Sequence, residues 1–127
     1  MPADDFEQFA QATRDGAYRA AMTSSSSVVC LAAPGTPVLY VSPLFTAHTG
    51  YTLEDVRGRS LSLLQGPETE PEAVDWFRRL IAARRAGRVA ITNYRRDGTM
   101  FRHRCDLRPI WSPAGDVTHF VAVQRPA

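Results

Sequence analysis

Thiols and imidazoles are the side chains of this sequence that could act as nucleophiles or metal ligands. The two cysteines, Cys30 and Cys105, lie far apart in the chain, and the three histidines are scattered. Neither set has the short, repeated spacing of a CxxC pair or of a metal-binding motif. We therefore expect free thiols, no metal site and no enzymatic activity.

Polar side chains also occur where strand alternation calls for apolar ones. Successive side chains of a strand point to opposite faces of the sheet. In residues 99–111 this rule defines an inward set, which consists of Phe101, His103, Cys105 and Leu107. Asp106 falls in the outward set, so it cannot form a catalytic relay with the inward histidine and cysteine. By the same rule Asn93 and Gln124 share inward faces with apolar neighbours.

Burial of Asn93, His103 and Gln124 requires hydrogen-bond partners, because each unpaired buried donor or acceptor costs about 1–3 kcal/mol. Two interpretations of these partners are open. In the first, the three side chains bond to one another, to loop backbone or to a buried water. In the second, they bond to a ligand. The convergence of three such residues on one sheet face favours the ligand.

The elements that must position these side chains are mainly strands. Strand-like segments occur at residues 28–32, 38–42, 88–96, 99–111 and 117–124. Asp97 and Gly98 suit a tight turn between the third and fourth segments. With helices placed between the second and third segments, this order predicts an α+β fold. We expect a five-stranded antiparallel sheet with short helices packed on one face.

Capping patterns predict the helices between the second and third strands. Thr52 and Asp55 have the spacing of a capping box, which predicts a short helix. Thr69 and Glu72 have the same spacing and predict the start of a longer helix. Apolar residues at helical spacing then continue this helix until Gly87.

A further amphipathic segment precedes the sheet. In residues 4–22 apolar side chains recur at helical spacing, and two aspartates stand near the start, where the helix dipole favours negative charge. The serine run at residues 24–27 then interrupts the pattern, as short hydroxyl side chains favour linkers. We therefore divide the chain into an N-terminal flanking helix, residues 1–23, and a globular domain, residues 24–127.

The composition excludes several classes of protein. Apolar residues make up 44% and charged residues 22%, which is typical of one soluble core and not of a disordered chain. The net charge of +2 gives no reason to expect a nucleic-acid partner. All 15 basic residues are Arg, which indicates a genome-wide composition bias. We expect a bacterial source. No membrane span or signal peptide is evident, so we expect a cytoplasmic protein.

Three segments carry a resemblance to a known family. GRSLSLLQGPET at residues 58–69, NYRRDG at 93–98 and FVAVQ at 120–124 resemble, in order and approximate spacing, the signature segments of light-oxygen-voltage (LOV) domains. These domains are flavin photoreceptors of the PAS superfamily. TPVLYVSPLF and TGY, within residues 36–51, resemble the second strand and the following helix of that family. The resemblance covers about residues 28–125 and implies a PAS fold.

The resemblance also implies a cofactor. LOV domains bind a flavin, usually FMN, between the sheet and the short helices; FAD or no flavin are the alternatives here. Matched by position, Asn93 would bond the pyrimidine edge, Gln124 would face the N5/O4 side, and Gln65 would contact the ring or its chain. Amides suit a ring edge because they offer both a donor and an acceptor. Arg78 stands where the family binds phosphate, although a solvated helix residue is the alternative in this Arg-rich chain.

The sequence departs from the family where the photochemistry takes place. The photoreactive cysteine, which forms an adduct with the flavin, corresponds to Leu61, and leucine cannot be a nucleophile. Ser60 replaces the neighbouring Asn, Leu63 replaces an aromatic residue, and His103 replaces the second ring-binding Asn. Ser62 occupies the position of a second phosphate-binding Arg. The cysteinyl adduct is therefore predicted to be lost, and retention of the flavin stays open.

Two functions are consistent with these features. The first is a LOV-like sensory domain that binds FMN and responds to blue light or redox by flavin reduction without a cysteinyl adduct. The second is a flavin-free PAS module that binds a protein or another small ligand, with Leu61 and Leu63 closing an apolar pocket. Cys30 and Cys105 either approach the flavin or serve as small buried apolar side chains.

We expect a homodimer through the N-terminal helix and the outer sheet face, and a downstream signalling partner.

Overall fold

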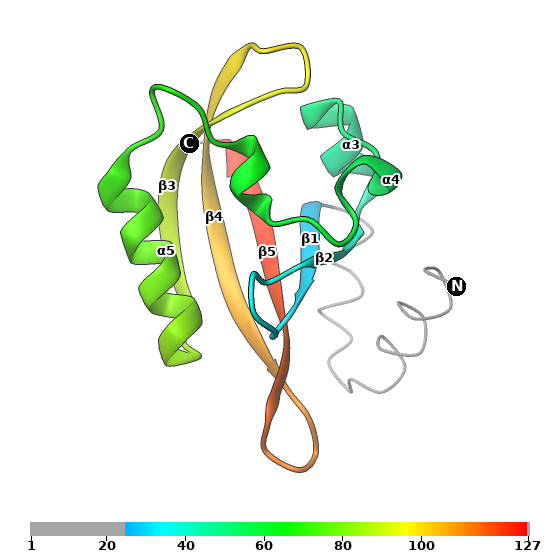
Figure 1. The fold of residues 1–127 in the computed structure, drawn as a ribbon, viewed down its shortest axis with the longest axis vertical. Helices are drawn as coiled ribbons and strands as arrows, with labels where there is room; N and C mark the ends of the chain where they lie inside the picture. The colour runs from blue at the N-terminus through cyan, green and yellow to red at the C-terminus, as the bar shows by residue number, and fades with distance from the viewer. Residues whose placement is uncertain (1–24, 127) are drawn as a thin grey trace.

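A central antiparallel sheet organises residues 25–126, the part of the chain that this computed structural model describes (Figure 1). Its strands are β1 (Ser26–Leu31), β2 (Val38–Val41), β3 (Gly87–Tyr94), β4 (Met100–Trp111) and β5 (Val117–Pro126). They lie in the order β2-β1-β5-β4-β3, and each neighbouring pair is antiparallel. The five-stranded sheet predicted from the sequence is therefore confirmed.

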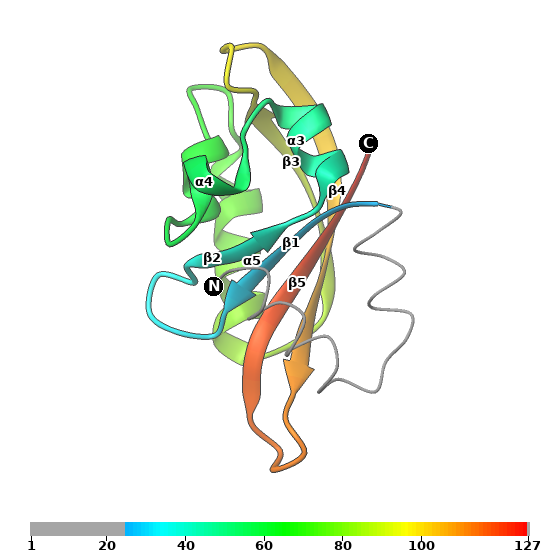
Figure 2. The ribbon, with the colours of Figure 1, turned by 90° about the vertical axis from the view of Figure 1, so that its right-hand side faces the viewer.

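Helices cover one face of this sheet (Figure 2). They are α3 (Pro43–Thr49), α4 (Leu53–Val56), the 3-10 helix η1 (Leu61–Leu64) and α5 (Pro71–Ala83). This arrangement is the predicted α+β fold. The amphipathic helix predicted at residues 4–22 lies outside the described residues. No helix within residues 25–126 is long and apolar enough to cross a membrane.

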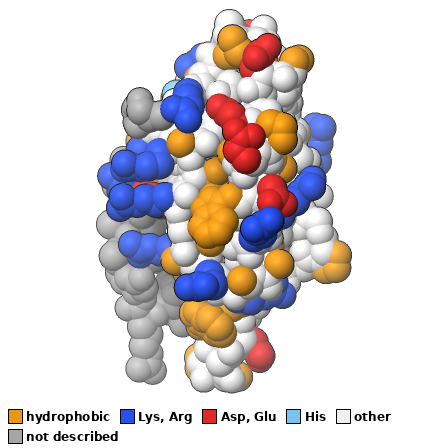
Figure 3. Space-filling view, turned by 90° about the vertical axis from the view of Figure 1, so that its left-hand side faces the viewer, with side chains coloured by type: hydrophobic (Ala, Val, Ile, Leu, Met, Phe, Trp, Pro, Cys, Tyr) orange, Lys and Arg blue, Asp and Glu red, His pale blue; other side chains and the backbone are white. Residues whose placement is uncertain are grey.

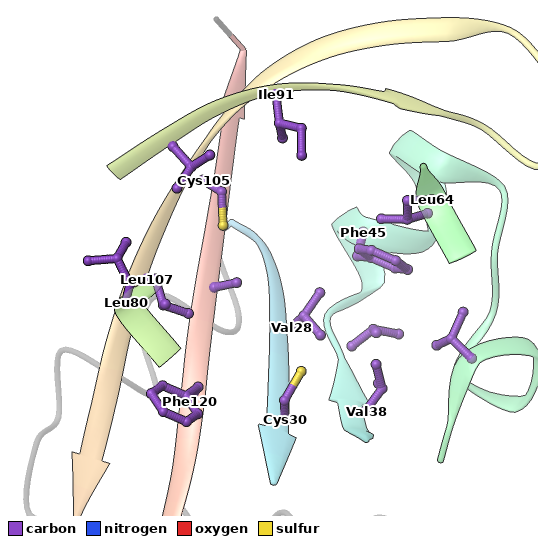
Figure 4. Close-up of a cluster of buried hydrophobic side chains, with 14 of the residues drawn as sticks. Val28, Cys30, Val38, Phe45, Leu64, Leu80, Ile91, Cys105, Leu107 and Phe120 are labelled. Atoms are coloured by element: carbon purple, nitrogen blue, oxygen red, sulfur yellow. The ribbon is translucent and has the colours of Figure 1, made fainter. Parts of the chain in front are cut away.

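The inward faces of the strands also agree with the alternation of the sequence. The buried side chains of β3, β4 and β5 on the helical side are Val89, Ile91, Asn93, Phe101, His103, Cys105, Leu107, Phe120, Ala122 and Gln124. The apolar ones among them, apart from Phe101, join residues of the helices and of β1 in one core cluster, part of which Figure 4 shows. The core therefore lies between the sheet and the helical layer.

The outward face of the sheet carries most of the charge of β4. Asp106 forms ion pairs with Arg88 at 3.0 Å, Arg125 at 3.4 Å and Arg104 at 3.9 Å. Asp106 is thus on the face opposite His103, as predicted. Figure 3 shows several Arg side chains along the left edge of that view and others at its centre and right. The sheet therefore separates a charged outer face from an apolar interior.

The start of β1 differs from the predicted linker. Ser26 and Ser27 belong to β1 and pair with β5. The Ser42 hydroxyl accepts a hydrogen bond from the Ser27 amide at 2.8 Å and donates one to the Ser25 carbonyl at 2.7 Å. The same hydroxyl caps α3 by accepting from the Phe45 amide. Long-range backbone pairing therefore overrides the local preference of serine for loops.

Of the two predicted capping boxes, one is present. Thr52 and Asp55 exchange side-chain hydrogen bonds with each other's backbone amides, at 3.2 and 2.9 Å, and so fix the start of α4. The capping box predicted at Thr69 and Glu72 is wrong. Helix α5 instead has Glu70 at its N-cap position, and no side chain caps it.

Contacts with β3 explain why the capping box predicted at the start of α5 does not form. The Thr69 hydroxyl donates to the Thr92 carbonyl at 2.7 Å. The Glu70 carboxylate accepts from the Thr92 amide at 2.7 Å and from the Thr92 hydroxyl at 3.0 Å. These side chains therefore bind the neighbouring strand and are not available to the first turn of α5.

The end of α5 also comes earlier than predicted. The helix ends at Ala83, and Arg84 follows it in the left-handed conformation with a φ of 56°. Gly87 lies beyond the helix, at the start of β3. A Cβ atom at Gly87 would lie 2.7 Å from Cδ1 of Leu80, so a larger residue there would require the Leu80 side chain to shift.

Candidate functional site

A cavity of about 590 Å³ lies between the sheet and the helical layer. Its volume is in the range of small-molecule sites, which is about 300–1,000 Å³. Strands β1, β3, β4 and β5 supply its floor, and η1, α5 and the loop at residues 32–36 supply the opposite wall. The cavity therefore opens within the core that the sequence predicted.

All the predicted cofactor-binding residues line this one cavity. They are Ser60, Leu61, Gln65, Arg78, Asn93, His103 and Gln124. The structure thus brings together side chains from β3, β4, β5, α5 and the segment around η1. Leu63 is different, since it packs against the core cluster and is not among the lining residues. Of the two residues predicted to close the pocket, only Leu61 lines it.

Asn93 and His103 form a buried pair at the sheet side of the cavity. The Asn93 amide group lies 2.6 Å from Nε2 of His103. With its oxygen facing the imidazole, the amide accepts from His103, and its nitrogen donates to the Leu64 and Thr92 carbonyls at 3.3 Å each. The alternative orientation would leave these polar atoms mismatched. Asn93 therefore connects β4 to η1 through its side chain.

The imidazole of His103 is neutral and only half satisfied. The side chain is 2% exposed. Burial, followed by the nearby charge of His48, lowers the pKa of His103 to about 4. Within residues 25–126, Nδ1 of His103 is a buried atom without a hydrogen-bond partner. Such an atom is rare in a protein interior and suggests a missing partner.

The side-chain amide of Gln124 is also only partly hydrogen-bonded. Its Oε1 accepts a hydrogen bond at 3.0 Å from the hydroxyl of Ser26, which stands opposite it in the register of β1 and β5. Among residues 25–126 the Gln124 amide nitrogen has no hydrogen-bond partner. This side chain can therefore donate to a ligand while it remains attached to the start of β1.

The two cysteines both line the cavity, but neither has the properties of a reactive thiol. Cys30 stands on β1 and Cys105 on β4, with β5 between the two strands (Figure 4). Both are free and buried. Burial raises the pKa of each thiol to about 12. Both thiols are therefore protonated at neutral pH, and neither is an activated nucleophile.

Several lining residues were not identified from the sequence as part of a site. Val74, Phe77 and Ile81 form the wall contributed by α5, and their helical spacing indicated a packed face but not a cavity. Arg84 also lines the cavity, where its guanidinium donates to the Ile81 carbonyl at 2.9 Å and lies 5.9 Å from the Phe120 ring centre. No sequence signal marks Arg84, because its position depends on the left-handed turn after α5.

The charges around the cavity are of one sign. Arg78 and Arg84 are exposed residues of its lining, and no carboxylate is found among the lining residues. A guanidinium binds phosphate or carboxylate well because its fork presents parallel donors. The cavity therefore combines apolar walls, a polar sheet side and two cations. This combination suits a flat, largely apolar ligand with a polar edge and an anionic group.

Comparisons with known proteins identify the family of the chain. The PAS domain family matches residues 25–125. The chain is 40% identical over 91 residues to Blue-light-activated histidine kinase 1 of Erythrobacter litoralis. The matched region covers 72% of this chain and 25% of that protein. The chain is also 36% identical over 91 residues to the Bacterioopsin transcriptional activator of Halobacterium salinarum, covering 72% and 14%. The chain therefore spans a quarter or less of these curated relatives.

Solved structures give the same result at the level of the fold. The dark structure of the blue-light photoreceptor Aureochrome1 LOV matches with a TM-score of 0.81 and 33% identity, covering 91% of this chain and 86% of that one. The LOV domain of a blue-light activated histidine kinase of Erythrobacter litoralis matches with a TM-score of 0.76 and 29% identity, covering 80% and 94%. The chain belongs to the PAS domain family, and within that family it is similar to the LOV domains of blue-light photoreceptors.

Proposed function

We propose that this chain is a LOV-like sensory domain that binds FMN in the cavity and signals blue light or redox state without a cysteinyl adduct. The observation that carries the proposal is the cavity itself, which joins apolar walls to Asn93, His103 and Gln124 on one side. Arg78 and Arg84 offer cations for the phosphate. This arrangement matches the chemistry of FMN, which has a flat ring, a polar edge and an anionic tail.

Two unsatisfied groups support the fit. His103 Nδ1 and the Gln124 amide nitrogen lack hydrogen-bond partners within residues 25–126. A ring edge that displays donors and acceptors would satisfy both. When bound, FMN would supply blue-light absorption and reversible reduction. The residues of the chain would bind and orient it, exclude water, and respond to a change in its hydrogen bonding.

The absence of an adduct follows from the side chains near the ring site. Leu61 lines the cavity at the position of the family's reactive cysteine and has no nucleophilic atom. Cys30 and Cys105 also line the cavity, but burial raises the pKa of both thiols to about 12. We therefore expect photoreduction of FMN to leave every thiol unmodified, and we propose no catalytic activity for the domain.

The flavin-free PAS module is the second candidate function. It is favoured by the hydrogen bonds of Asn93, which are made with Leu64, Thr92 and His103 and do not require a ligand. It is also consistent with Ser62, which lines the cavity at the position where the LOV family has a second phosphate-binding Arg. In this case the cavity would take another small molecule, or the domain would act through protein contacts alone.

Absorption spectroscopy distinguishes the two candidates. The purified protein is mixed with FMN, freed of unbound ligand and recorded before and after blue light with an electron donor present. We expect bound oxidised flavin at one per chain, bleaching in light, and recovery in air. Mass spectrometry of the illuminated, denatured chain should show unmodified Cys30 and Cys105. Failure of any flavin to remain bound would favour the flavin-free module.

The wider setting is also a proposal, because the chain spans only a quarter or less of its curated relatives. We propose a cytoplasmic homodimer that forms through residues 1–23 and the outer sheet face. A downstream signalling protein, and neither nucleic acid nor membrane, would receive the signal. Light scattering over a range of concentrations tests the dimer, and a monomer at the highest concentration would contradict it.

A further inference from the structure

The two ring nitrogens of His103 have different surroundings. Nε2 lies 2.6 Å from the Asn93 amide, whereas Nδ1 is buried without a partner in residues 25–126. The ring lines the cavity and is 2% exposed. A polar atom buried this deeply costs free energy unless something bonds to it. Of the two ring nitrogens, Nδ1 is therefore the one that lacks a partner within residues 25–126.

Asn93 fixes which nitrogen carries the proton. Its amide nitrogen donates to the Leu64 and Thr92 carbonyls, which can only accept, so its oxygen must face His103. An amide oxygen also can only accept. Nε2 of His103 must therefore be the protonated nitrogen. A neutral imidazole has one donor and one acceptor, so Nδ1 is the acceptor.

The surroundings of the ring keep it neutral. His48 and Arg95 are the basic groups nearby, and each packs on Phe101, at 4.6 Å and 4.9 Å from its ring centre respectively. Phe101 in turn lies 5.1 Å from the His103 ring. Cys105, the next inward residue of β4 after His103, is an uncharged thiol. With cations nearby and no carboxylate lining the cavity, nothing stabilises a second proton on His103.

We propose that Nδ1 of His103 accepts a hydrogen bond from a ring N–H of the ligand, with Asn93 as the positioning residue that fixes the tautomer. The inference rests on the proposed function and deepens it. In FMN the only ring N–H of the oxidised isoalloxazine is the imide N–H of the pyrimidine ring. LOV domains have an asparagine at this position, which can donate as well as accept. This chain would therefore select for a ligand donor more strictly than its relatives.

A ligand without the N–H tests the proposed bond. FMN and 3-methyl-FMN, in which a methyl group replaces the imide hydrogen, are titrated into wild type, H103F and H103Q. We expect wild type to bind 3-methyl-FMN about 10-fold or more weakly than FMN, because Nδ1 would remain unpaired. H103F should lose most of this difference, since phenylalanine cannot accept. H103Q should retain part of it, because its amide oxygen can.

The tautomer can be tested without any flavin. Nitrogen-15 NMR of the ligand-free protein should show a bare Nδ1 and a protonated Nε2 on His103. The Asn93→Leu variant, which removes the fixing contact, should show both tautomers. A protonated Nδ1 in the wild-type protein would overturn the inference whatever the flavin result.

The failures of the two proposals give different results. If neither flavin binds to wild type, the proposed function fails and the inferred bond fails with it. If both bind wild type with equal affinity, the inference is overturned while the proposed function stands. Circular dichroism of each variant confirms its fold, and H103Q preserves the test if H103F does not fold.

Discussion

A neutral histidine buried beside a cavity makes stability depend on pH in a particular direction. Burial lowers the pKa of His103 from 6.5 to about 4 in the folded state. Between these values the unfolded chain binds a proton that the folded chain does not. The free energy of unfolding therefore has its full value above pH 6.5, and the contribution of the neutral His103 is lost as the pH falls toward about 4. This contribution amounts to about 3 kcal/mol at most.

Urea unfolding of the wild type and of the His103→Asn variant measures this effect. We expect the free energy of unfolding of the wild type to fall more steeply between pH 6.5 and pH 4. His48 and His119 titrate in both proteins, so their contributions cancel in the comparison. Parallel curves for the two proteins over this interval would show that His103 is not buried as a neutral ring.

At the residue scale the sequence predicted which side chains meet but not how they bond. Alternation placed Asn93, His103 and Gln124 on inward faces because the side-chain period of a strand depends only on local geometry. The pairing of Asn93 with His103 was one of two open interpretations. The tautomer of His103 depends on the Leu64 carbonyl, whose position comes from the packing of η1 on the sheet. Such a contact between distant segments has no local signal.

At the element scale, helix α5 owes its start to contacts with β3. Glu70 accepts two hydrogen bonds from Thr92 and lies 3.7 Å from Arg102. We expect Glu70→Ala to lower the free energy of unfolding by about 1–2 kcal/mol, because it removes hydrogen bonds to a charged acceptor. Glu72→Ala, in the first turn of α5, is the matched control and should change stability by less than about 0.5 kcal/mol.

Thermal or urea unfolding of the two variants decides between two accounts of this helix. The capping box predicted from Thr69 and Glu72 would make Glu72 the more important residue. The contacts of the structure make Glu70 the more important one. An equal or larger loss in Glu72→Ala would contradict the role assigned to Glu70. The prediction of a capping box at Thr69 and Glu72 was wrong because a capping pattern depends only on neighbouring residues. It contains no information about contacts with a distant strand such as β3.

The elements themselves were largely predictable. Each strand has an alternating or β-branched stretch, and Thr52 with Asp55 identified α4. Helix α3 was not located by periodicity, because it is short and its cap, Ser42, also serves the start of β1. The end of α5 at Ala83, just before Arg84, also has no local signal. A non-glycine residue in a left-handed conformation gives no warning in sequence.

At the scale of the whole molecule, the sheet order links the cavity to the start of the domain. The first and last strands, β1 and β5, are neighbours in the middle of the sheet. Gln124 on β5 lines the cavity and accepts from the hydroxyl of Ser26, the first residue of β1. A change in the hydrogen bonding of Gln124 would therefore reach the start of β1 through one side-chain contact.

This contact was not visible in the sequence, because it joins residues from opposite ends of the domain. Only the register of β1 on β5, with Ser26 opposite Gln124, brings them together. The local sequence predicts a linker for the serine run at residues 24–27, whereas Ser26 and Ser27 belong to the central sheet. The route from the cavity to the start of β1 is therefore a property of the topology.

The Ser26→Ala variant tests this route in the flavin-loaded protein. We expect it to bind and photoreduce FMN as the wild type does, because Ser26 is not among the residues that line the cavity. Hydrogen exchange of residues 25–31, compared in darkness and in blue light, should change in the wild type and change much less in Ser26→Ala. The neighbouring Ser25→Ala, which keeps the backbone carbonyl that Ser42 uses, is the control and should respond as the wild type does. An undiminished light response in Ser26→Ala would mean that the signal leaves the cavity through another strand or through the helical layer.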